Sequence, residues 1–236
     1  MTPTTSKAAL SAIDLAGGYG DTKILRRISF ELGHGEVLGV LGRNGVGKST
    51  LMKLLAGHLP PMAGEMVFQG VPMGDAPAHA RKRLGLAYAP QEGVVFDSLS
   101  VQDNLTLHRR ERGVNAYAEL LQEFPRVRER LPQSAGTLSG GEKKLVSFCR
   151  ALADKAQVTI LDEPTEGVQQ ENIDRMAKIV VDQRRIERAS FVIVEQNITF
   201  LLAVIDRVIV LDHGDIVLSA RAADVDRSRL EDALRV

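Results

Sequence analysis

The segment "GRNGVGKST" at residues 42–50 is the feature that most constrains the fold, because it contains the pattern G-x-x-x-x-G-K-[ST]. An apolar run precedes it at 36–41, and the helix-type sequence "STLMKLLAGHL" follows at 49–59. A glycine-rich loop between a strand and a helix can turn its backbone N–H groups toward a phosphate chain, since no Cβ blocks the approach. The first turn of the helix adds free N–H groups and a positive dipole end. The sequence therefore predicts a phosphate-binding loop here, in preference to a glycine-rich turn that arose by chance.

Two adjacent carboxylates, Asp162 and Glu163, end the apolar run "VTIL" and are followed at once by Pro164. Two acids at the tip of a buried strand repel each other unless they share something positive, which predicts nucleotide-bound Mg²⁺. In this interpretation Lys48 reaches the β- and γ-phosphates, and Ser49 offers its hydroxyl to the metal. Asp162 holds Mg²⁺ directly or through a water, and Glu163 orients or deprotonates the water that attacks the γ-phosphate. The alternative is an exposed acidic turn, which the preceding apolar run and Pro164 argue against.

Strands and helices alternate through most of the chain. The helix-type patterns lie at 49–59 and 170–187, and the strand-type runs lie at 84–90, 158–163, 190–195 and 207–218. This alternation predicts an α/β fold with a mainly parallel sheet that is covered on both faces. Nearer the N-terminus, "ISFEL" and "EVLGVLG" flank Gly33-His34-Gly35 as in a hairpin, and "GEMVFQG" adds another strand. These strands predict an antiparallel β subdomain attached to the main sheet.

The strand-type signal disappears over about 92–156. Ser100 stands three residues before an acid, as at a helix start, and leads into a helix with Gly113 as its stop. A second helix at 116–124 is expected to end at Pro125. We interpret this part of the chain as an α-helical subdomain inserted into the α/β core.

The charge balance bears on possible partners. The chain has 30 Lys plus Arg and 30 Asp plus Glu, so no overall field attracts polyanions and nucleic acid is disfavoured as the main partner.

The one cysteine, Cys149, excludes an internal disulfide and fits a reducing compartment. The start "MTPTTSKAAL" lacks the stretches of a secretory signal, and the most apolar region, 190–211, is too interrupted by charges to span a bilayer. We expect a soluble protein in the cytoplasm.

The segment "LSGGEKK" at 138–144 completes a set of three motifs with the loop at 42–50 and "ILDEP" at 160–164. With the motifs in this order, the chain resembles the ATP-binding cassette (ABC) ATPase family over nearly its whole length. The resemblance implies ATP and Mg²⁺ as ligands, ATP hydrolysis as the activity, and one ABC domain over 8–236 with a P-loop NTPase core. The glycines that open the helix at 142–153 make a second anion-binding helix end. In the family this end faces the γ-phosphate held by the opposite subunit of a head-to-tail dimer.

The resemblance also implies roles for single residues. Tyr19 matches the aromatic residue that stacks on adenine, and Gln91 matches the glutamine at the junction with the helical subdomain, where it senses Mg²⁺ or the attacking water. The expected nucleotide-binding residues are Tyr19, Gly42, Arg43, Asn44, Gly45, Val46, Gly47, Lys48, Ser49 and Thr50. The expected signature residues are Leu138, Ser139, Gly140, Gly141 and Glu142. The expected metal-binding residues are Ser49, Gln91 and Asp162, and the expected catalytic residues are Glu163 and Gln196.

Two positions depart from the family pattern. Gln169 stands where the loop after the strand carboxylates usually has an Asp, and Gln196 replaces the family's switch histidine. Glutamine can donate a hydrogen bond to the γ-phosphate but cannot hold a proton near pH 7. We therefore expect Gln196 to act as a neutral γ-phosphate sensor and intrinsic hydrolysis to be modest. The sequences "DEPTEGVQ" and "VEQN" look like those of the importer branch that handles branched-chain amino acids, urea and short amides.

The importer branch implies several partners and a location. The expected partners are transmembrane permease subunits, a second ABC ATPase subunit in a homo- or heterodimer, and, indirectly, a periplasmic substrate-binding protein. The expected location is the cytoplasmic face of the bacterial inner membrane. A soluble non-transport ABC-type ATPase and the ATPase of an ABC exporter are the open alternatives, whereas a P-loop small-molecule kinase does not explain "LSGGE". The cargo is not encoded in this chain, because the ATPase does not touch it.

Overall fold

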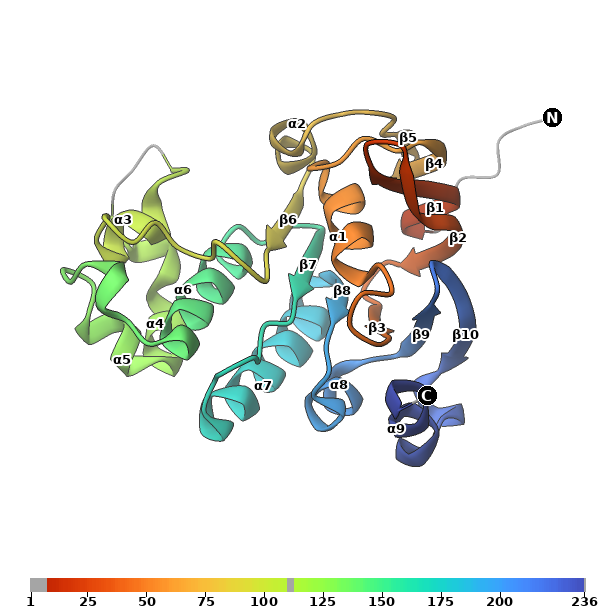
Figure 1. The fold of residues 1–236 in the computed structure, drawn as a ribbon. Helices are drawn as coiled ribbons and strands as arrows, with labels where there is room; N and C mark the ends of the chain where they lie inside the picture. Colours follow the sequence, from red (N-terminus) through yellow and green to blue (C-terminus); the bar gives the residue numbers. More distant parts are fainter. Residues whose placement is uncertain (1–7, 110–112, 236) are drawn as a thin grey trace.

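A computed structural model describes residues 8–109 and 113–235 (Figure 1). Within these residues, six strands form a central sheet in the order β10-β9-β3-β8-β7-β6. Their bounds are β3 (Val37–Leu41), β6 (Leu86–Ala89), β7 (Val158–Asp162), β8 (Ser190–Val194), β9 (Arg207–Asp212) and β10 (Asp215–Arg221). All neighbouring pairs are parallel except β9 and β10. The expected mainly parallel sheet is confirmed.

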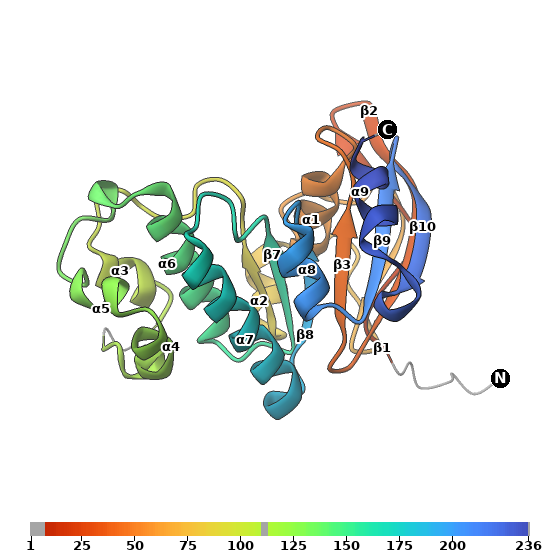
Figure 2. The same ribbon diagram turned by 90° about the horizontal axis from the view of Figure 1, so that it is seen from below.

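Helices cover both faces of this sheet, which is why β3, β7 and β8 are buried along their whole length (Figure 2). On one face, Leu38 and Val40 of β3 pack in one apolar cluster with the helix α1 (Lys48–Ala56). On the other face, Val37 and Leu41 belong to a second apolar cluster, to which three helices beside the sheet contribute among others. These helices are α6 (Gly140–Leu152), α7 (Gln170–Glu187) and α8 (Ile198–Val204).

A second sheet is antiparallel and has the order β2-β1-β4-β5. Its strands are β1 (Ala8–Tyr19), β2 (Thr22–Gly33), β4 (Ala63–Phe68) and β5 (Val71–Pro72). The expected antiparallel sheet and the strand in "GEMVFQG" are confirmed. β1 was not among the strands predicted from the sequence, although it is the strand that joins β2 to β4.

The predicted hairpin around Gly33-His34-Gly35 is wrong. The turn links β2 of the antiparallel sheet to β3 of the central sheet, and the two strands do not pair. A fully apolar strand such as β3 is stable only where both of its faces are covered, and the middle of the central sheet provides that cover. Glycine-rich turn residues alone do not distinguish a hairpin from a change of sheet.

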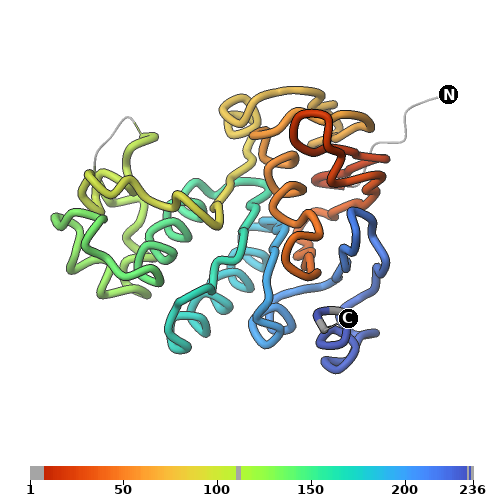
Figure 3. Tube along the Cα trace, in the orientation of Figure 1, coloured from red at the N-terminus to blue at the C-terminus, as the bar shows by residue number. Residues whose placement is uncertain are grey.

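Helices α3 to α6 lie between β6 and β7 in the chain and extend to one side of the central sheet (Figures 1 and 3). The first three are α3 (Val101–Thr106), α4 (Ala118–Glu123) and α5 (Pro125–Glu129), with short 3₁₀ turns at Asn115–Tyr117 and Ala135–Thr137. The capping of α3 by Ser100 is confirmed, because its hydroxyl oxygen accepts from the Asp103 N–H at 2.9 Å. The second expected helix does end before Pro125, which begins α5.

The first expected helix is shorter than predicted, because α3 ends at Thr106 and not near Gly113. Residues 110–112 lie outside the described residues. After α3 the chain turns so that the Arg109 guanidinium reaches the Ala153 carbonyl at 3.0 Å and Asp154 at 3.1 Å. This tertiary contact with the end of α6 ends the helix earlier than its local sequence suggests.

The remaining helices are α2 (Ala78–Arg83), the 3₁₀ turn Ala222–Asp224, and α9 (Arg227–Arg235). Among the residues described, no helix combines the length and the apolar composition needed to cross a membrane.

Candidate functional site

The carboxyl ends of β3, β6, β7 and β8 meet at one edge of the central sheet, which is where parallel α/β sheets bind ligands. The loops that follow these strands line an open groove of about 420 Å³. The lining residues are Tyr19, Ile24, Asn44, Gly45, Gly47, Lys48, Ser49, Thr50, Gln91, Glu163, Glu166 and Gln196. The structure thus brings together both predicted catalytic residues, most of the predicted nucleotide-binding residues, and two of the three predicted metal-binding residues.

The loop after β3 folds around its own lysine. Gly47 is the N-cap of α1 with a φ of 109°, a conformation that glycine adopts without strain. Lys48 is buried, and its Nζ donates to the carbonyl oxygens of Gly42 at 2.7 Å and Arg43 at 2.9 Å. Burial lowers the pKa of Lys48, while the two acidic residues at the end of β7 oppose that shift. The lysine therefore sits inside the loop, within the electrostatic field of the carboxylates.

Asp162, the last residue of β7, is only 2% exposed. Its Oδ2 accepts a hydrogen bond from the Tyr88 hydroxyl at 3.2 Å, whereas its Oδ1 is buried without a hydrogen-bond partner. Burial raises the pKa of Asp162 to about 6, against a lowering effect of the Tyr88 hydrogen bond and with a further rise caused by Glu163. A buried oxygen without a partner is energetically costly. It is, however, a suitable ligand for a cation.

The donors around Asp162 fit Mg²⁺, which prefers oxygen ligands and binds through one or two carboxylates together with substrate phosphates. Ser49 and Gln91 line the groove and contribute a hydroxyl and an amide oxygen. Across residues 8–109 and 113–235, no group of three or more His, Cys, Asp or Glu is arranged to hold a metal ion by itself. This donor set therefore suits a metal that binds together with phosphates.

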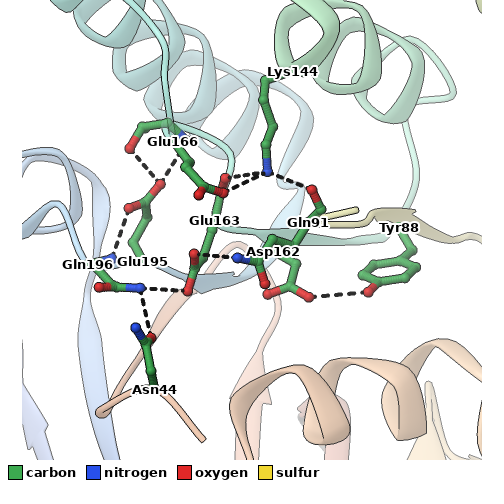
Figure 4. A network of polar contacts seen from close by, with 10 residues as sticks. Asn44, Tyr88, Gln91, Lys144, Asp162, Glu163, Glu166, Glu195 and Gln196 are labelled. Carbon is green, nitrogen blue, oxygen red and sulfur yellow. Dashed lines mark hydrogen bonds and ion pairs between the residues drawn. The ribbon is translucent and has the colours of Figure 1, made fainter. Parts of the chain in front are cut away.

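Glu163 is held between two amide side chains (Figure 4). Its Oε2 accepts from Gln91 Nε2 at 2.8 Å, and its Oε1 accepts from Gln196 Nε2 at 3.0 Å. Its backbone N–H donates to the Val194 carbonyl at 2.9 Å, and its φ is 48°. A positive φ is uncommon for a residue with a side chain, and it persists where the surroundings impose it. The carboxylate is therefore fixed in one orientation at the groove.

Gln196 also connects the loop after β8 to the phosphate loop. Its Nε2 donates to Asn44 Oδ1 at 3.1 Å in addition to Glu163. The expected sensor is thus in direct contact with the expected catalytic acid, which the sequence did not indicate.

Tyr19 ends β1 and lies on the rim of the groove with about half of its surface exposed. The Lys53 ammonium lies 5.7 Å from the centre of the tyrosine ring and 3.3 Å from its hydroxyl. Lysine over an aromatic face is a favourable cation–π arrangement. The ring is therefore held at the mouth of the groove by a residue of α1.

The signature residues line a different cavity, which contains Ser139, Gly141 and Glu142 but no residue of the phosphate loop. Ser139 caps α6, and a reciprocal capping box with Glu142 is present. A Cβ on Gly141 would lie 2.2 Å from the Gly167 carbonyl oxygen, so this position requires glycine. Within one chain, the signature helix end and the phosphate loop therefore do not form a common site.

Two residues that contact the strand-end acids were not among those predicted from the sequence, namely Tyr88 and Lys144. The Lys144 ammonium projects from α6, donates to the carbonyl oxygens of Gln91 at 2.9 Å and Glu163 at 3.0 Å, and lies 3.5 Å from a Glu166 oxygen. Of the two, only Lys144 carried a signal in the sequence, because it lies on the apolar-spaced helix after the signature.

Comparisons with known proteins agree with this geometry. The sequence profile of the ABC transporter family matches residues 25–166. The chain is 34% identical over 220 residues to the high-affinity branched-chain amino acid transport ATP-binding protein BraG of Pseudomonas aeruginosa, covering 91% of this chain and 94% of that protein. It is 32% identical over 230 residues to the lipopolysaccharide export system ATP-binding protein LptB of Escherichia coli, covering 92% of each chain.

Among solved structures, the fold is similar to that of an ATP-binding subunit of an ABC transporter. The TM-score is 0.83 at 24% sequence identity, and the match covers 97% of this chain and 100% of the other. The α/β architecture, with its added antiparallel sheet and helices, is therefore that of known ABC ATPase structures.

Proposed function

The chain belongs to the ABC transporter family and is an ATPase, and from this premise we propose that it is the ATP-hydrolysing subunit of a bacterial importer for branched-chain amino acids, urea or short amides. The observation that carries the catalytic part is the position of Glu163, which two amide side chains hold at the groove beside the phosphate loop. A carboxylate fixed at this place can orient or deprotonate a water that attacks the γ-phosphate. One acid would suffice for nucleotide binding, and the second accounts for hydrolysis.

In this proposal the groove binds Mg-ATP. Tyr19 stacks on the adenine, and the backbone N–H groups of the phosphate loop and the first turn of α1 bind the phosphates. Lys48 exchanges its contacts with loop carbonyls for the β- and γ-phosphates. Ser49, Gln91 and Asp162 would hold Mg²⁺, which neutralises charge that develops on the phosphates when it is bound.

We further propose that two cassettes close around two ATP molecules. The end of α6 at Ser139 is an anion-binding helix end that shares no cavity with the chain's own phosphate loop. It therefore serves a phosphate held by another subunit. ATP contacts on both subunits exist only in the closed dimer, so ATP binding favours closure and hydrolysis reverses it.

The proposed partners are permease subunits, a second ABC ATPase subunit, and indirectly a periplasmic substrate-binding protein. We propose that the chain is one ABC domain over 8–236 and that its helical subdomain at about 92–156 transmits closure to the permease at the cytoplasmic face of the inner membrane. The position of Gln91 supports this proposal, because Gln91 both contacts Glu163 and begins the segment that leads into α3. Nucleic acid is not a proposed partner, since the charges of the chain balance.

The proposed cargo class is supported by the sequences around Gln169 and Gln196 and by the likeness to BraG. An exporter is the second candidate, and the similar identity to LptB favours it. A soluble ABC-type ATPase without a permease is a third candidate.

Affinity purification from detergent-solubilised native membranes in Mg-ATP, with partners identified by mass spectrometry, tests these alternatives. Two permeases of the amino acid or amide type and a second cassette would support the importer. Export-system subunits would favour the second candidate, and the absence of any membrane partner, repeated with Glu163→Gln to trap the ATP-bound dimer, would favour the third. Unchanged ATP turnover in Glu163→Gln would contradict the role of Glu163.

A further inference from the structure

Glu195 is a buried acid that no role described above uses. It follows β8 directly and is 3% exposed. A buried carboxylate is unfavourable unless it is fully hydrogen-bonded. Within the described residues, the groups that hydrogen-bond to Glu195 are all uncharged N–H or O–H donors. Hydrogen bonds from these donors therefore stabilise the buried carboxylate.

Both carboxylate oxygens of Glu195 accept two hydrogen bonds. Oε1 accepts from the Thr165 backbone N–H at 2.8 Å and from the Thr165 hydroxyl at 2.7 Å. Oε2 accepts from the backbone N–H groups of Gln196 at 2.9 Å and Asn197 at 3.0 Å. Burial raises the pKa of Glu195, and these hydrogen bonds oppose the rise. Four donors from two loops thus converge on one side chain.

The two loops are the ones that carry the catalytic groups. Thr165 lies two residues after Glu163, in the loop that leads from β7 to α7. Gln196 lies in the loop from β8 to α8 and donates to Glu163 through its side chain. Asn197 caps α8 through its own side chain, so this loop is also tied to the helix behind it. Figure 4 shows Glu195 beside Gln196, with its carboxylate directed toward the loop that follows Glu163.

We propose that Glu195 is a positioning residue for ATP hydrolysis, which holds the loop after Glu163 and the loop that contains Gln196 in fixed relation to each other. The inference rests on the proposed roles of Glu163 and Gln196. Glu195 is not among the residues that line the groove, and in this proposal it acts through the two loops and not through ATP. Glu195 instead determines where Glu163 and Gln196 are placed. Small displacements of catalytic groups strongly lower the rate of the chemical step.

A carboxylate is required because every partner of Glu195 donates. Glutamine has the same shape, but its NH₂ group would face either the Thr165 N–H or the two N–H groups after β8. In either orientation at least one backbone N–H loses its acceptor. Glu195→Gln therefore loosens one loop without opening a cavity.

Steady-state ATP hydrolysis by the purified full-length chain tests the inference. We expect Glu195→Gln to lower kcat by about 10- to 100-fold. KM for ATP is expected to stay within about twofold of the parent, because the phosphate loop and Tyr19 are not among the partners of Glu195. Thr165→Val, which removes only the hydroxyl donor, is expected to lower kcat in the same direction by less. It also serves as the test if Glu195→Gln does not fold.

Asp206→Asn is the matched control. Asp206 also accepts from a backbone N–H, that of Val37 at 2.9 Å, but it does so at the amino end of β3, far from the groove along the strand. It also pairs with Arg184 at 2.6 Å. This variant is expected to lower the melting temperature while kcat stays at the parent value. An equal loss of kcat in Asp206→Asn and Glu195→Gln would overturn the inference, because the effect would then be general destabilisation.

Further outcomes are equally decisive. Parent kcat in folded Glu195→Gln, or a raised KM with unchanged kcat, would overturn the positioning role. In a Gln196→Ala background, Glu195→Gln should cost less than in the parent, because part of its action passes through Gln196. If Glu163→Gln abolishes turnover and Glu195→Gln does not, only the inference about Glu195 fails. If Glu163→Gln retains turnover, the proposed catalytic function fails, and the inference fails with it.

Discussion

The side-chain amide of Gln196 donates a 3.0 Å hydrogen bond to Oε1 of Glu163. The two residues follow β8 and β7, neighbouring parallel strands whose carboxyl ends meet at the groove. An amide at position 196 holds the carboxylate without supplying a titratable charge, whereas a histidine would add one near neutral pH. In this chain the expected catalytic acid is therefore oriented by a neutral donor.

Replacement of this donor gives the first prediction. Gln196→Ala is expected to lower kcat by about 10- to 100-fold, because one of the two side-chain donors that orient Glu163 is lost. The measurement is ATP turnover at saturating Mg-ATP. Gln122→Ala, which removes an exposed glutamine on α4, is the control and should leave turnover unchanged. A Gln196→Ala protein as fast as the parent would show that Gln196 has no part in hydrolysis.

The second prediction compares two adjacent lysines on α6. Lys144 donates to the carbonyl oxygens of Gln91 and Glu163, whereas Lys143 pairs with Asp97 at the surface at 2.8 Å. Lys144→Met leaves both carbonyls without this donor and should lower kcat by about tenfold or more. Lys143→Met should change neither kcat nor KM for ATP. Steady-state kinetics and thermal melts of both variants provide the test, and equal behaviour of the two lysines would contradict it.

Asp162→Asn provides the third prediction, a gain in stability with a loss of function. The substitution removes a buried charge with an unpartnered oxygen, so the free energy of unfolding of the nucleotide-free protein should rise by about 3 kcal/mol. The Asn amide oxygen can still accept from the Tyr88 hydroxyl. Urea unfolding without nucleotide measures the gain in stability. Calorimetric titration of Mg²⁺ in the presence of a non-hydrolysable ATP analogue measures the loss of function as weaker metal binding. An unfolding free energy lower than that of the parent would contradict this account of Asp162.

The fourth prediction concerns pH and Asp154, which follows α6. Its carboxylate lies 3.2 Å from Lys82, 3.1 Å from Arg109 and 2.9 Å from His108. Burial by itself raises the pKa of Asp154, but the hydrogen bond and charge of His108 and the charge of Lys82 lower it below its usual value. A lowered folded-state pKa means that the stabilisation is present above the unfolded value of 3.8 and is lost as the pH falls through the folded value.

We therefore expect Asp154→Asn to lower the free energy of unfolding near neutral pH by about 1 kcal/mol. The difference from the parent should be present above the unfolded pKa of 3.8 and shrink below it. Urea unfolding of both proteins across this range measures the difference, with the exposed turn variant Asp21→Asn as the control. A difference that does not change below that pH would assign the effect to packing rather than to charge.

Much of the site could be predicted because its requirements are local. The phosphate loop needs glycine at Gly47, where φ is 109°, and the cap of α6 needs Ser139 and Glu142 at a fixed spacing. Strand-end positions such as Asp162 are equally local, since the apolar run before them indicates the strand. These features depend on backbone conformation and on hydrogen bonds between residues a few positions apart. Each is therefore visible in a short stretch of sequence.

The rest depends on which distant segments become neighbours. The glycines between β2 and β3 suggest a turn but do not say that the chain changes sheets there. The sequence around Tyr88 likewise does not indicate that its hydroxyl donates to Asp162, which lies 74 positions away.

The sequence by itself determined that this chain has a phosphate loop, two strand-end acids and a signature helix, because short-range geometry requires those residues at those spacings. Only the tertiary structure decided how they are assembled. The order β3-β8-β7-β6 brings Gln196, Glu163 and Gln91 to adjacent strand ends, and the carboxylate of Glu195 joins two of the loops. The physical reason is that a buried charge or amide must be hydrogen-bonded, and its partners come from whichever segments pack beside it. The residues next to it in the sequence do not indicate which segments those are.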